Sequence, residues 1–533
     1  MKTDTRYFLH TAQRLNTDVL KLRIEQSKLL RRLNDLHSAT RSLPPMILAN
    51  IFCYICDDLR ICEDIQVNYP AVQVLSRVCC KWRQIARATP TLWTRVLLRF
   101  KDPYWGSNSS VSMLQLHLVN SGSLALDILL DIPERYLYSC DRDTRSWESH
   151  YTPFASIFHL LFIENPTKLG SLLLTRSGGM PKDWLKLIEA YTTSPTGLLA
   201  VEGYPNLRKI QFRTGRGGFA SSEFGVHHLF KDTPVPRLAT LSIPNLEWKI
   251  HLPYENLTSL HLEVFPINQC IDFLINCPKL TEFHHNSCIE AVPKGVKPPE
   301  AQQRPSHVLP NLEQLRWSFG FTDWDIYFMT QFRFPSLTTF RVGCYCCPVI
   351  GRQSVGADVV TYWVPFLSSL TNLKNICLDT ELFPIASFES LWTCLSHLDH
   401  LDSVHITCEG YPTAEQTRTI LQPLALSLET SSPLPQPIYL PHLTTLRVDF
   451  GHLYRLPDNA DVFLLLLESR AQSAKVPGIK SLQFHGQTFA GYDEESPVWT
   501  RWTEGQRQRL EKLTEHGLKL ISTKEEFIGI KDD

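Results

Sequence analysis

An eight-residue pattern recurs along most of this chain of 533 residues and constrains its fold more than any other feature of the sequence. The pattern is Pro-x-Leu-x-x-φ-x-φ, where φ is usually a large apolar residue and the first position varies. Ten copies occur, with leading residues 19 to 42 positions apart, at Leu207, Leu238, Leu257, Leu280, Leu312, Leu337, Leu373, Leu401, Leu443 and Ile479. The alternation of the last two apolar positions predicts one short strand in each copy.

Segments between the copies carry the spacing of amphipathic helices. Apolar residues follow an i, i+3, i+4, i+7 order over residues 267–274 and again over 388–395. A strand and a helix that repeat with one handedness stack into a solenoid, in which strands line an inner, concave face and helices line the outer one. The sequence therefore predicts an α/β fold, with a solenoid over residues 101–525 that includes a C-terminal helix.

The polar position between the last two apolar residues predicts a surface. Strand side chains alternate between two faces, so this residue points away from the core and onto the concave face. The position is occupied by Gln211, Ser242, His261, His284, Arg316, Arg341, Cys377, His405, Arg447 and Gln483. This row contains arginines and histidines but no carboxylate, while the next outward positions add Arg213, Glu263, Asp379 and Asp449. The face is therefore mixed, with a basic centre line near Arg316 and Arg341, which favours binding of an acidic or phosphorylated segment. The alternative is a row of ordinary solvated strand residues.

The first 41 residues are expected to form a helix of their own, because this segment lacks Gly and Pro. Leucines recur every seven residues and the positions four residues later complete a heptad seam, which consists of Leu15, Val19, Leu22, Gln26, Leu29, Leu33 and Leu36. Two interpretations stay open. One is a coiled coil through which chains associate over residues 15–36, and the other is an amphipathic helix that lies back on the next domain.

Residues 42–100 are expected to form a compact helical unit. Pro44 and Pro45 fix a backbone conformation that suits the start of a helix. Apolar residues then gather on one helical face over 47–55 and, after a polar connection, on a second face over 74–85. Three short helices around one core are the simplest arrangement, and Trp82 and Trp93 are expected in that core.

Three blocks of this unit resemble the F-box. They read LPPMILANIF over 43–52, VCCKWRQIA over 78–86 and TPTLW over 89–93, against a family pattern of L-P-x-E-I-L-x-x-I-F, then V-C-(K/R)-x-W-R-x-(I/L)-A, then L-W. Met46 stands where the family has Glu, and the connection between the first two blocks is longer than in a minimal F-box. With its repeats, the chain is similar to the leucine-rich-repeat F-box proteins of mushroom-forming fungi, in which a leucine-rich helix precedes the F-box.

This resemblance implies a binding function without chemistry. In the family, the F-box docks on the Skp-family adaptor of a cullin–RING ubiquitin ligase of the SCF type, and the repeat domain captures a protein substrate. The adaptor contact carries over onto an apolar set, Pro44, Pro45, Ile47, Leu48, Ile51, Phe52, Leu75, Val78 and Cys79. For each of these, the alternative is a core residue of the unit itself. The alternative function is a scaffold of the same fold without a role in ubiquitin ligation.

Charge and composition argue against nucleic acid and membranes as partners and indicate the cellular location. Lys and Arg number 53 against 54 Asp and Glu, a balance that disfavours nucleic acid and membrane surfaces as partners. The chain begins without a secretory signal, and its apolar runs fall far short of the roughly 20 residues of a membrane span. We therefore expect a cytoplasmic and/or nuclear protein whose 15 cysteines are reduced.

No catalytic residue, cofactor or metal is predicted, and the protein is not expected to be an enzyme. A G-x-G-x-x-A match at 215–220 is followed by prolines instead of a second parallel strand. The cysteines at 344, 346 and 347 lack a companion C-x-x-C pair. The pairs His227-His228 and His284-His285 lack nearby carboxylates at the spacing of metal ligands, and the chain has no H-E-x-x-H, G-x-S-x-G or P-loop motif.

Overall fold

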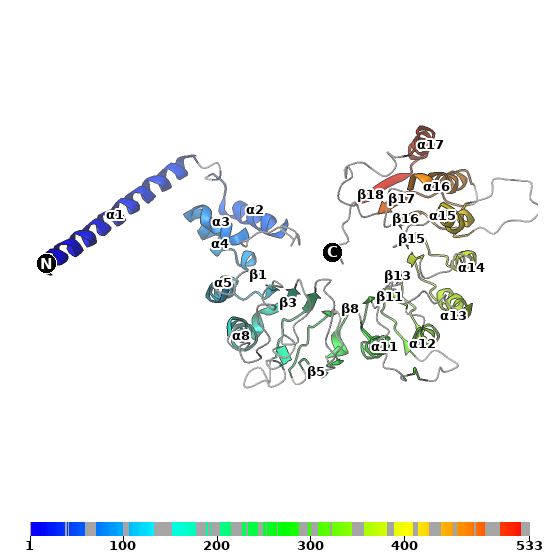
Figure 1. Cartoon of the computed structure of the whole chain (residues 1–533), viewed down its shortest axis with the longest axis horizontal. Helices are drawn as coiled ribbons and strands as arrows, with labels where there is room; N and C mark the ends of the chain where they lie inside the picture. The colour runs from blue at the N-terminus through cyan, green and yellow to red at the C-terminus, as the bar shows by residue number, and fades with distance from the viewer. Residues whose placement is uncertain are drawn as a thin grey trace, which may run out of the picture. The chain divides into compact units, whose positions relative to one another are not determined.

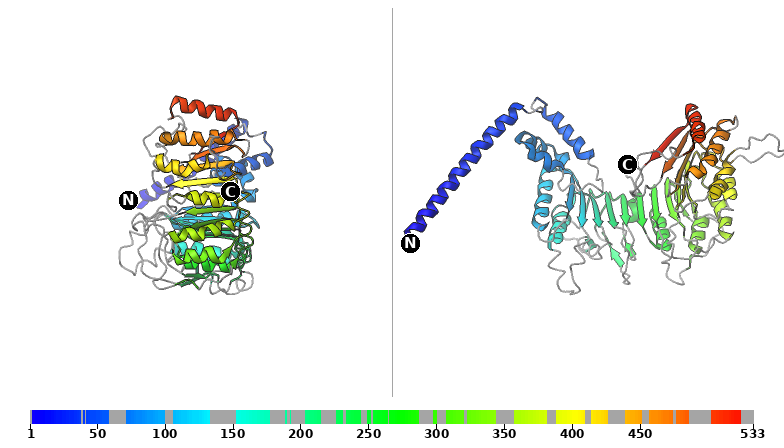
Figure 2. Two further views of the ribbon diagram at one scale, coloured as in Figure 1. Left: turned by 90° about the vertical axis from the view of Figure 1, so that its right-hand side faces the viewer. Right: turned by 45° about the horizontal axis from the view of Figure 1, so that its top comes forward.

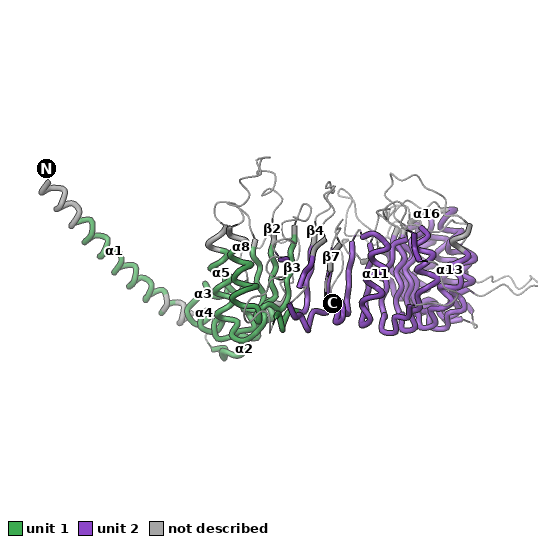
Figure 3. Tube along the Cα trace, turned by 90° about the horizontal axis from the view of Figure 1, so that it is seen from below, with its two compact units in different colours: residues 1–180, 190–207, 215–217 green, residues 181–189, 208–214, 218–533 purple. Residues whose placement is uncertain are grey.

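The computed structural model divides the chain into two compact units, which Figure 3 colours separately. Unit 1 comprises residues 1–180, 190–207 and 215–217, and unit 2 comprises residues 181–189, 208–214 and 218–533. Both combine helices with parallel strands, so the chain is a mixed α/β protein, as the sequence predicts. The structure describes residues 2–37, 40, 42–58, 71–99, 106–132, 152–176, 188–189, 192, 203–214, 226–230, 233–243, 249–251, 253–263, 265–286, 297–299, 307–319, 322–343, 357–380, 388–408, 414–425, 439–450, 456–473, 476–485 and 502–523.

Within these ranges, no helix is both long enough and apolar enough to cross a membrane.

Unit 1 begins with the long helix α1 (Lys2–His37), which matches the helix expected at the start of the chain. Its seam does not lie back on the next domain. The side chains that the structure describes there are all exposed, namely Leu15, Val19, Leu22, Gln26, Leu29 and Leu33. The side chain of Leu36 lies outside the described residues. The exposed seam is compatible with the coiled coil, one of the two interpretations of this segment.

A small helical unit follows, formed by α2 (Pro45–Asp58), α3 (Ala71–Val78), α4 (Cys80–Arg87) and the short helix η1 (Pro90–Trp93). Its core is apolar and contains Leu48, Phe52, Val72, Leu75, Ile85, Ala86, Leu92 and Trp93. Trp93 is buried and donates its indole N–H to the carbonyl of Ala86 at 2.7 Å, which satisfies its one polar group. Trp82 is partly buried and packs on Phe52 with ring centroids 4.8 Å apart.

The strands of unit 1 start directly after η1, earlier than the expected boundary at residue 100. β1 (Arg95–Arg99), β2 (Leu126–Ile132) and β3 (Leu169–Arg176) pair in parallel. Two helices connect them, α5 (Gly106–Asn120) and α8 (Thr152–His159). His117 of α5 is buried, and its Nδ1–H donates to the carbonyl of Trp93 at 2.9 Å. This bond ties the first connecting helix to the end of the helical unit.

Unit 2 is built on a parallel sheet to which each of the ten repeat copies contributes one strand. The strands occur in chain order, β4 (Lys209–Thr214), β6 (Thr240–Ile243), β8 (Ser259–Glu263), β9 (Glu282–Asn286), β11 (Gln314–Ser318), β13 (Thr339–Gly343), β14 (Asn375–Asp379), β15 (Ser403–Cys408), β16 (Thr445–Phe450), β17 (Ser481–His485) and then β18 (Lys519–Thr523). The prediction of one strand in each copy is therefore confirmed. Two short pairs lie apart from this sheet, β5 (Val226–His228) with β7 (Lys249–His251) and β10 (His307–Val308) with β12 (Phe332–Arg333).

Helices lie along one face of this sheet (Figures 1 and 2). They are α11 (Ile267–Asn276), α12 (Asp323–Gln331), α13 (Ala357–Ser368), α14 (Phe388–Leu395), α15 (Ala414–Leu421), α16 (Leu456–Ala471) and α17 (Glu504–Glu515). The two helices predicted from spacing are α11 and α14. The opposite side of the sheet, which these helices leave uncovered, is called the open face below.

The leading leucine of each copy fixes the start of its strand. In the copy before β9, the N–H of Leu280 donates to the carbonyl of Cys277 at 3.3 Å and closes a tight turn. All ten leading residues are buried. The carbonyl of Thr258, the residue after the leading Leu257 of the preceding copy, accepts hydrogen bonds from the N–H groups of Thr281 and Glu282 at 2.8 and 3.0 Å. These two bonds join the neighbouring copies. The same pair of bonds recurs along the sheet, so equivalent positions stack on one another.

One buried arginine organises the turn that precedes β16. Arg470 of α16 is fully buried and donates three hydrogen bonds to carbonyl groups, through Nε to Leu424 at 3.1 Å and through Nη2 to Tyr439 at 2.5 Å and Leu440 at 3.1 Å. Leu440 has a φ of 48°, in the left-handed region that costs free energy for a leucine. Arg470 therefore stabilises a turn whose backbone is strained at Leu440.

Candidate functional site

The apolar residues expected to contact an adaptor divide into a buried and an exposed set. Leu48, Phe52 and Leu75 are core residues of the helical unit. Pro44, Pro45, Ile47, Ile51 and Val78 are exposed. Cys79 is partly buried and caps α4, because its Sγ accepts the N–H of Trp82 at 3.4 Å. Both sets come from the same helices, so one side of each helix closes the core while the other faces solvent.

The exposed side forms a larger apolar surface than the sequence indicated. We call it the helical patch, and it consists of Met46, Ile47, Ile51, Tyr54 and Ile55 of α2 with Val74 and Val78 of α3, all exposed. Four of these seven, Met46, Tyr54, Ile55 and Val74, are absent from the predicted contact set. For Ile55 and Val74 the signal was the i+4 spacing of 47, 51 and 55 and of 74 and 78, which places them on one face of each helix.

Hydrogen bonds hold the start of α2 against α4 and so fix the patch. Lys81 Nζ donates to the carbonyls of Leu43 and Thr40 at 3.2 and 3.5 Å. Trp82 Nε1 donates to the hydroxyl of Thr40 at 3.3 Å. These bonds come from the middle of the second motif block and reach across the unit, which orients the first block relative to the second.

The row predicted for the face away from the core is present and in register. Consecutive strands pair Gln211 with Ser242, Ser242 with His261 and His261 with His284. The series continues from His284 through Arg316, Arg341, Cys377, His405 and Arg447 to Gln483. These ten residues, called the open-face row, therefore form one line across the sheet of unit 2.

The chemistry of the open-face row changes along its length. Gln211, Ser242 and His261 are buried, whereas His284, Arg316, Arg341, His405 and Arg447 are half-buried. Cys377 Sγ lies 3.3 Å from His405 Nδ1, and burial raises the pKa of its thiol. Arg447 Nε is buried and has no hydrogen-bond partner in the described part of the chain. Arg316 and Arg341 are paired neighbours, which concentrates positive charge near the middle of the row.

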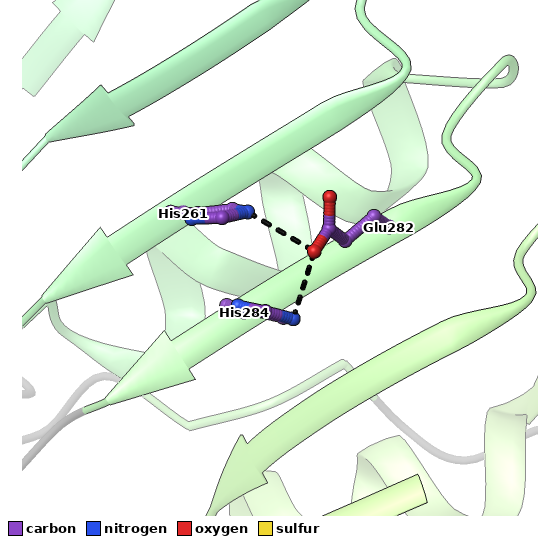
Figure 4. Close-up of side chains that lie close together, drawn as sticks. All are labelled: His261, Glu282 and His284. Atoms are coloured by element: carbon purple, nitrogen blue, oxygen red, sulfur yellow. Dashed lines mark ion pairs between the residues drawn. The ribbon is translucent and has the colours of Figure 1, made fainter. Parts of the chain in front are cut away.

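A cluster of two histidines and a carboxylate lies at one part of this row (Figure 4). Glu282 Oε1 is 3.4 Å from His261 Nε2 and 3.2 Å from His284 Nε2. The hydrogen bond with His261 holds the pKa of Glu282 well below its usual value. Burial, together with the charges of His261, Arg316 and Arg341, lowers the pKa of His284. Near neutral pH the cluster therefore contains an ionised carboxylate beside a neutral imidazole.

Most of the other motifs weighed in the sequence lie outside the described residues. The glycine-rich match at 215–220 and the cysteines at 344, 346 and 347 lie outside the described residues. The side chain of His227 also lies outside them, and the backbone N–H of His228 donates to Glu189 Oε1 at 2.9 Å. His285 is buried with a pKa lowered to about 4 by desolvation, and its Nε2–H donates to the carbonyl of Phe265 at 3.3 Å.

A search of known proteins found no family model that matches this chain and no curated protein that matches it significantly.

Proposed function

We propose that the chain is a non-catalytic substrate receptor of a cullin–RING ubiquitin ligase. Its helical unit would act as an F-box that binds a Skp-family adaptor, and unit 2 would act as a leucine-rich-repeat solenoid that binds a protein substrate. The observation that carries the proposal is the helical patch. It lies on α2, which carries the first motif block, and on α3, whose last residue begins the second block, and it stays exposed although the same helices close a complete core on their other side.

The physical chemistry of the patch supports a docking role. An apolar side chain of this size gains about 1.5–3 kcal/mol on full burial, and about half of that when it is already partly covered. Seven such side chains on adjoining helices would together supply several kcal/mol to an interface. Arg77 of α3 is also exposed and lies between Val74 and Val78 in the sequence, so a partner that covers the patch would lie beside one positive charge.

The open-face row supports binding of an acidic or phosphorylated segment. Arg316 and Arg341 are neighbours in register, and an arginine matches a carboxylate or phosphate with two parallel hydrogen bonds. Arg447 adds a buried Nε without a partner in the described structure. Asp379 and Asp449 lie two residues after Cys377 and Arg447 on the same side of their strands, so the face carries both signs of charge, with Arg316 and Arg341 as its paired arginines.

The adaptor contact is tested by capture of a purified Skp-family adaptor with the full chain. Ile51→Asp combined with Val78→Asp places two charges in the patch without touching the core. We expect this variant to lose adaptor capture while keeping the wild-type circular dichroism spectrum. Ile275→Asp is the matched control, because Ile275 of α11 and Ile51 are both 41% exposed.

Two results would contradict the adaptor contact. Undiminished capture by the Ile51→Asp, Val78→Asp variant would remove the patch as the docking surface. Failure of the wild-type chain to bind the adaptor would favour the alternative, a scaffold of the same fold without a role in ubiquitin ligation. The exposed Met46, which stands where the F-box pattern has Glu, is the feature on which that alternative depends.

The substrate contact is tested by affinity capture from cells, with partners identified by mass spectrometry. Arg316→Glu combined with Arg341→Glu reverses the charge in the middle of the open-face row. We expect loss of the substrate with unchanged adaptor capture and unchanged melting temperature. Arg418→Glu combined with Arg507→Glu makes the same change of charge on helices and is expected to retain the substrate; equal capture by both variants would move the binding site away from the row.

A further inference from the structure

We propose that His261, Glu282 and His284 form a binding site for a divalent transition-metal ion of the zinc type on the open face of unit 2. The proposal is independent of the proposed function, because it depends only on the geometry of this cluster. The three residues come from neighbouring strands, His261 from β8 and the other two from β9. Figure 4 shows their side chains converging on the same side of the sheet, with the carboxylate directed toward both imidazole rings.

The distances between the donor atoms suit tetrahedral coordination. All three donors lie within 4.8 Å of one another, and Glu282 Oε1 is 3.4 and 3.2 Å from the two Nε2 atoms. Zinc lies about 2.0–2.2 Å from nitrogen and oxygen ligands, so two ligands at a tetrahedral angle are about 3.3 Å apart. The carboxylate oxygen already holds this separation from each histidine. The two imidazole planes are inclined by only 22°, so the rings must also rotate about their side-chain bonds before both Nε2 lone pairs point at one ion.

The sheet fixes this arrangement before any ion binds. His261 pairs directly with His284, and Ser259 pairs with Glu282, so four side chains form a rectangle across two parallel strands. β6 and β11 flank these strands on either side, which keeps the backbone of the site inside the sheet. The two imidazole rings stack with centroids 4.2 Å apart and planes inclined by 22°. Ligands on paired interior strands are held more rigidly than ligands on loops.

Ser259 positions the carboxylate. Its hydroxyl donates to Glu282 Oε2 at 2.8 Å, which leaves Oε1 as the atom that contacts both histidines. Loss of a bond that orients a metal ligand in this way typically lowers metal affinity by 10- to 100-fold. The Nδ1 atoms of His261 and His284, by contrast, are buried and have no hydrogen-bond partner in the described part of the chain. Because this outer support is incomplete and Arg316 lies beside His284, we expect an affinity of about micromolar order rather than that of a structural zinc site.

The donor set selects the class of ion. Two imidazoles and one carboxylate favour zinc and its neighbours in the transition series, whereas magnesium and calcium prefer oxygen ligands. Three protein ligands leave the fourth position open. That position would be available to water or to an acidic group of a bound segment.

The test is a titration of the chelator-treated full chain with Co²⁺, followed by absorption and by calorimetry. The visible spectrum of Co²⁺ distinguishes nitrogen and oxygen ligands from thiolates, which separates this site from the 15 cysteines of the chain. We expect one Co²⁺ bound through nitrogen and oxygen, displaced by Zn²⁺. Glu282→Gln, which preserves the shape of the side chain, is expected to weaken binding at least tenfold, and His284→Gln likewise.

His405→Gln is the matched control, because His405 occupies the same row but lies outside the cluster. It is expected to bind Co²⁺ as the wild type does. Ser259→Ala keeps all three ligands and is expected to weaken binding about tenfold without altering the melting temperature of the metal-free protein. Equal Co²⁺ affinity and stoichiometry in the wild type and in Glu282→Gln would overturn the proposal. So would a wild-type chain that binds no Co²⁺ when the Co²⁺ concentration is about 100 times the expected micromolar Kd.

Discussion

Replacement of Arg470 by Met removes the buried cation that fastens the turn before β16. Each hydrogen bond from a charged donor contributes about 1.5–3 kcal/mol, and Arg470 donates three of them. Against this, burial lowers the pKa of Arg470 from 12.5 to about 10, which corresponds to about 3 kcal/mol against the charged form. The three bonds outweigh that cost, so we expect Arg470→Met to lower local stability by about 3 kcal/mol.

Hydrogen–deuterium exchange is the appropriate assay, because a repeat array does not unfold as a single two-state unit. A loss of about 3 kcal/mol would raise the open population of the segments 414–425 and 439–450 by roughly 100-fold. Arg507→Met is the control, since Arg507 forms an exposed pair with Glu504 that contributes less than about 1 kcal/mol. Wild-type exchange rates in Arg470→Met would refute the reasoning and show that the carbonyl groups find other donors.

Three further results are expected. Deletion of residues 1–38 should halve the mass measured by light scattering, since a second copy would cover the exposed seam of α1; an unchanged mass would contradict the coiled coil. Burial lowers the pKa of His117 below 6.5, so the unfolded state binds more protons and the free energy of unfolding should fall as pH drops below about 6.5. His117→Gln should flatten that dependence in thermal melts, and equal slopes in both proteins would argue against it. Leu48→Ala should cost about 2–5 kcal/mol, because Leu48 is 1% exposed, while Ile51→Ala should leave the melting temperature nearly unchanged; similar losses would mean that the two side chains are equally buried.

The repeat was the part of the fold that the sequence predicted best. The leading leucines and the alternating positions after them determine one strand in each copy, and the polar residue between them necessarily faces the other side of the sheet. The open-face row could therefore be written down from Gln211 to Gln483, and the parallel register of the strands confirms that these residues are aligned.

Two features could not be predicted because they depend on tertiary structure. The apolar residues of α2 occur on both sides of the helix, so the pattern alone does not determine that Leu48 faces the core and Ile51 faces solvent. The cluster around Glu282 depends on register: His261 precedes this residue by 21 positions, and only strand pairing brings the two side chains together. The carboxylate beside His284 is Glu282, which is not adjacent to the pair His284-His285 but lies two residues before His284 on the same face of the strand.

Because equivalent positions stack along unit 2, the residues that determine the framework are different from the residues that determine the open face. Buried leucines and the backbone ladder determine where each strand lies, whereas the residue in the middle of each strand contributes its chemistry to the open face. Divergence at these middle positions would change what the surface recognises while the framework beneath it stays the same. Recognition in a chain of this design can therefore evolve one strand at a time, and descendants with a common architecture would be expected to acquire different targets.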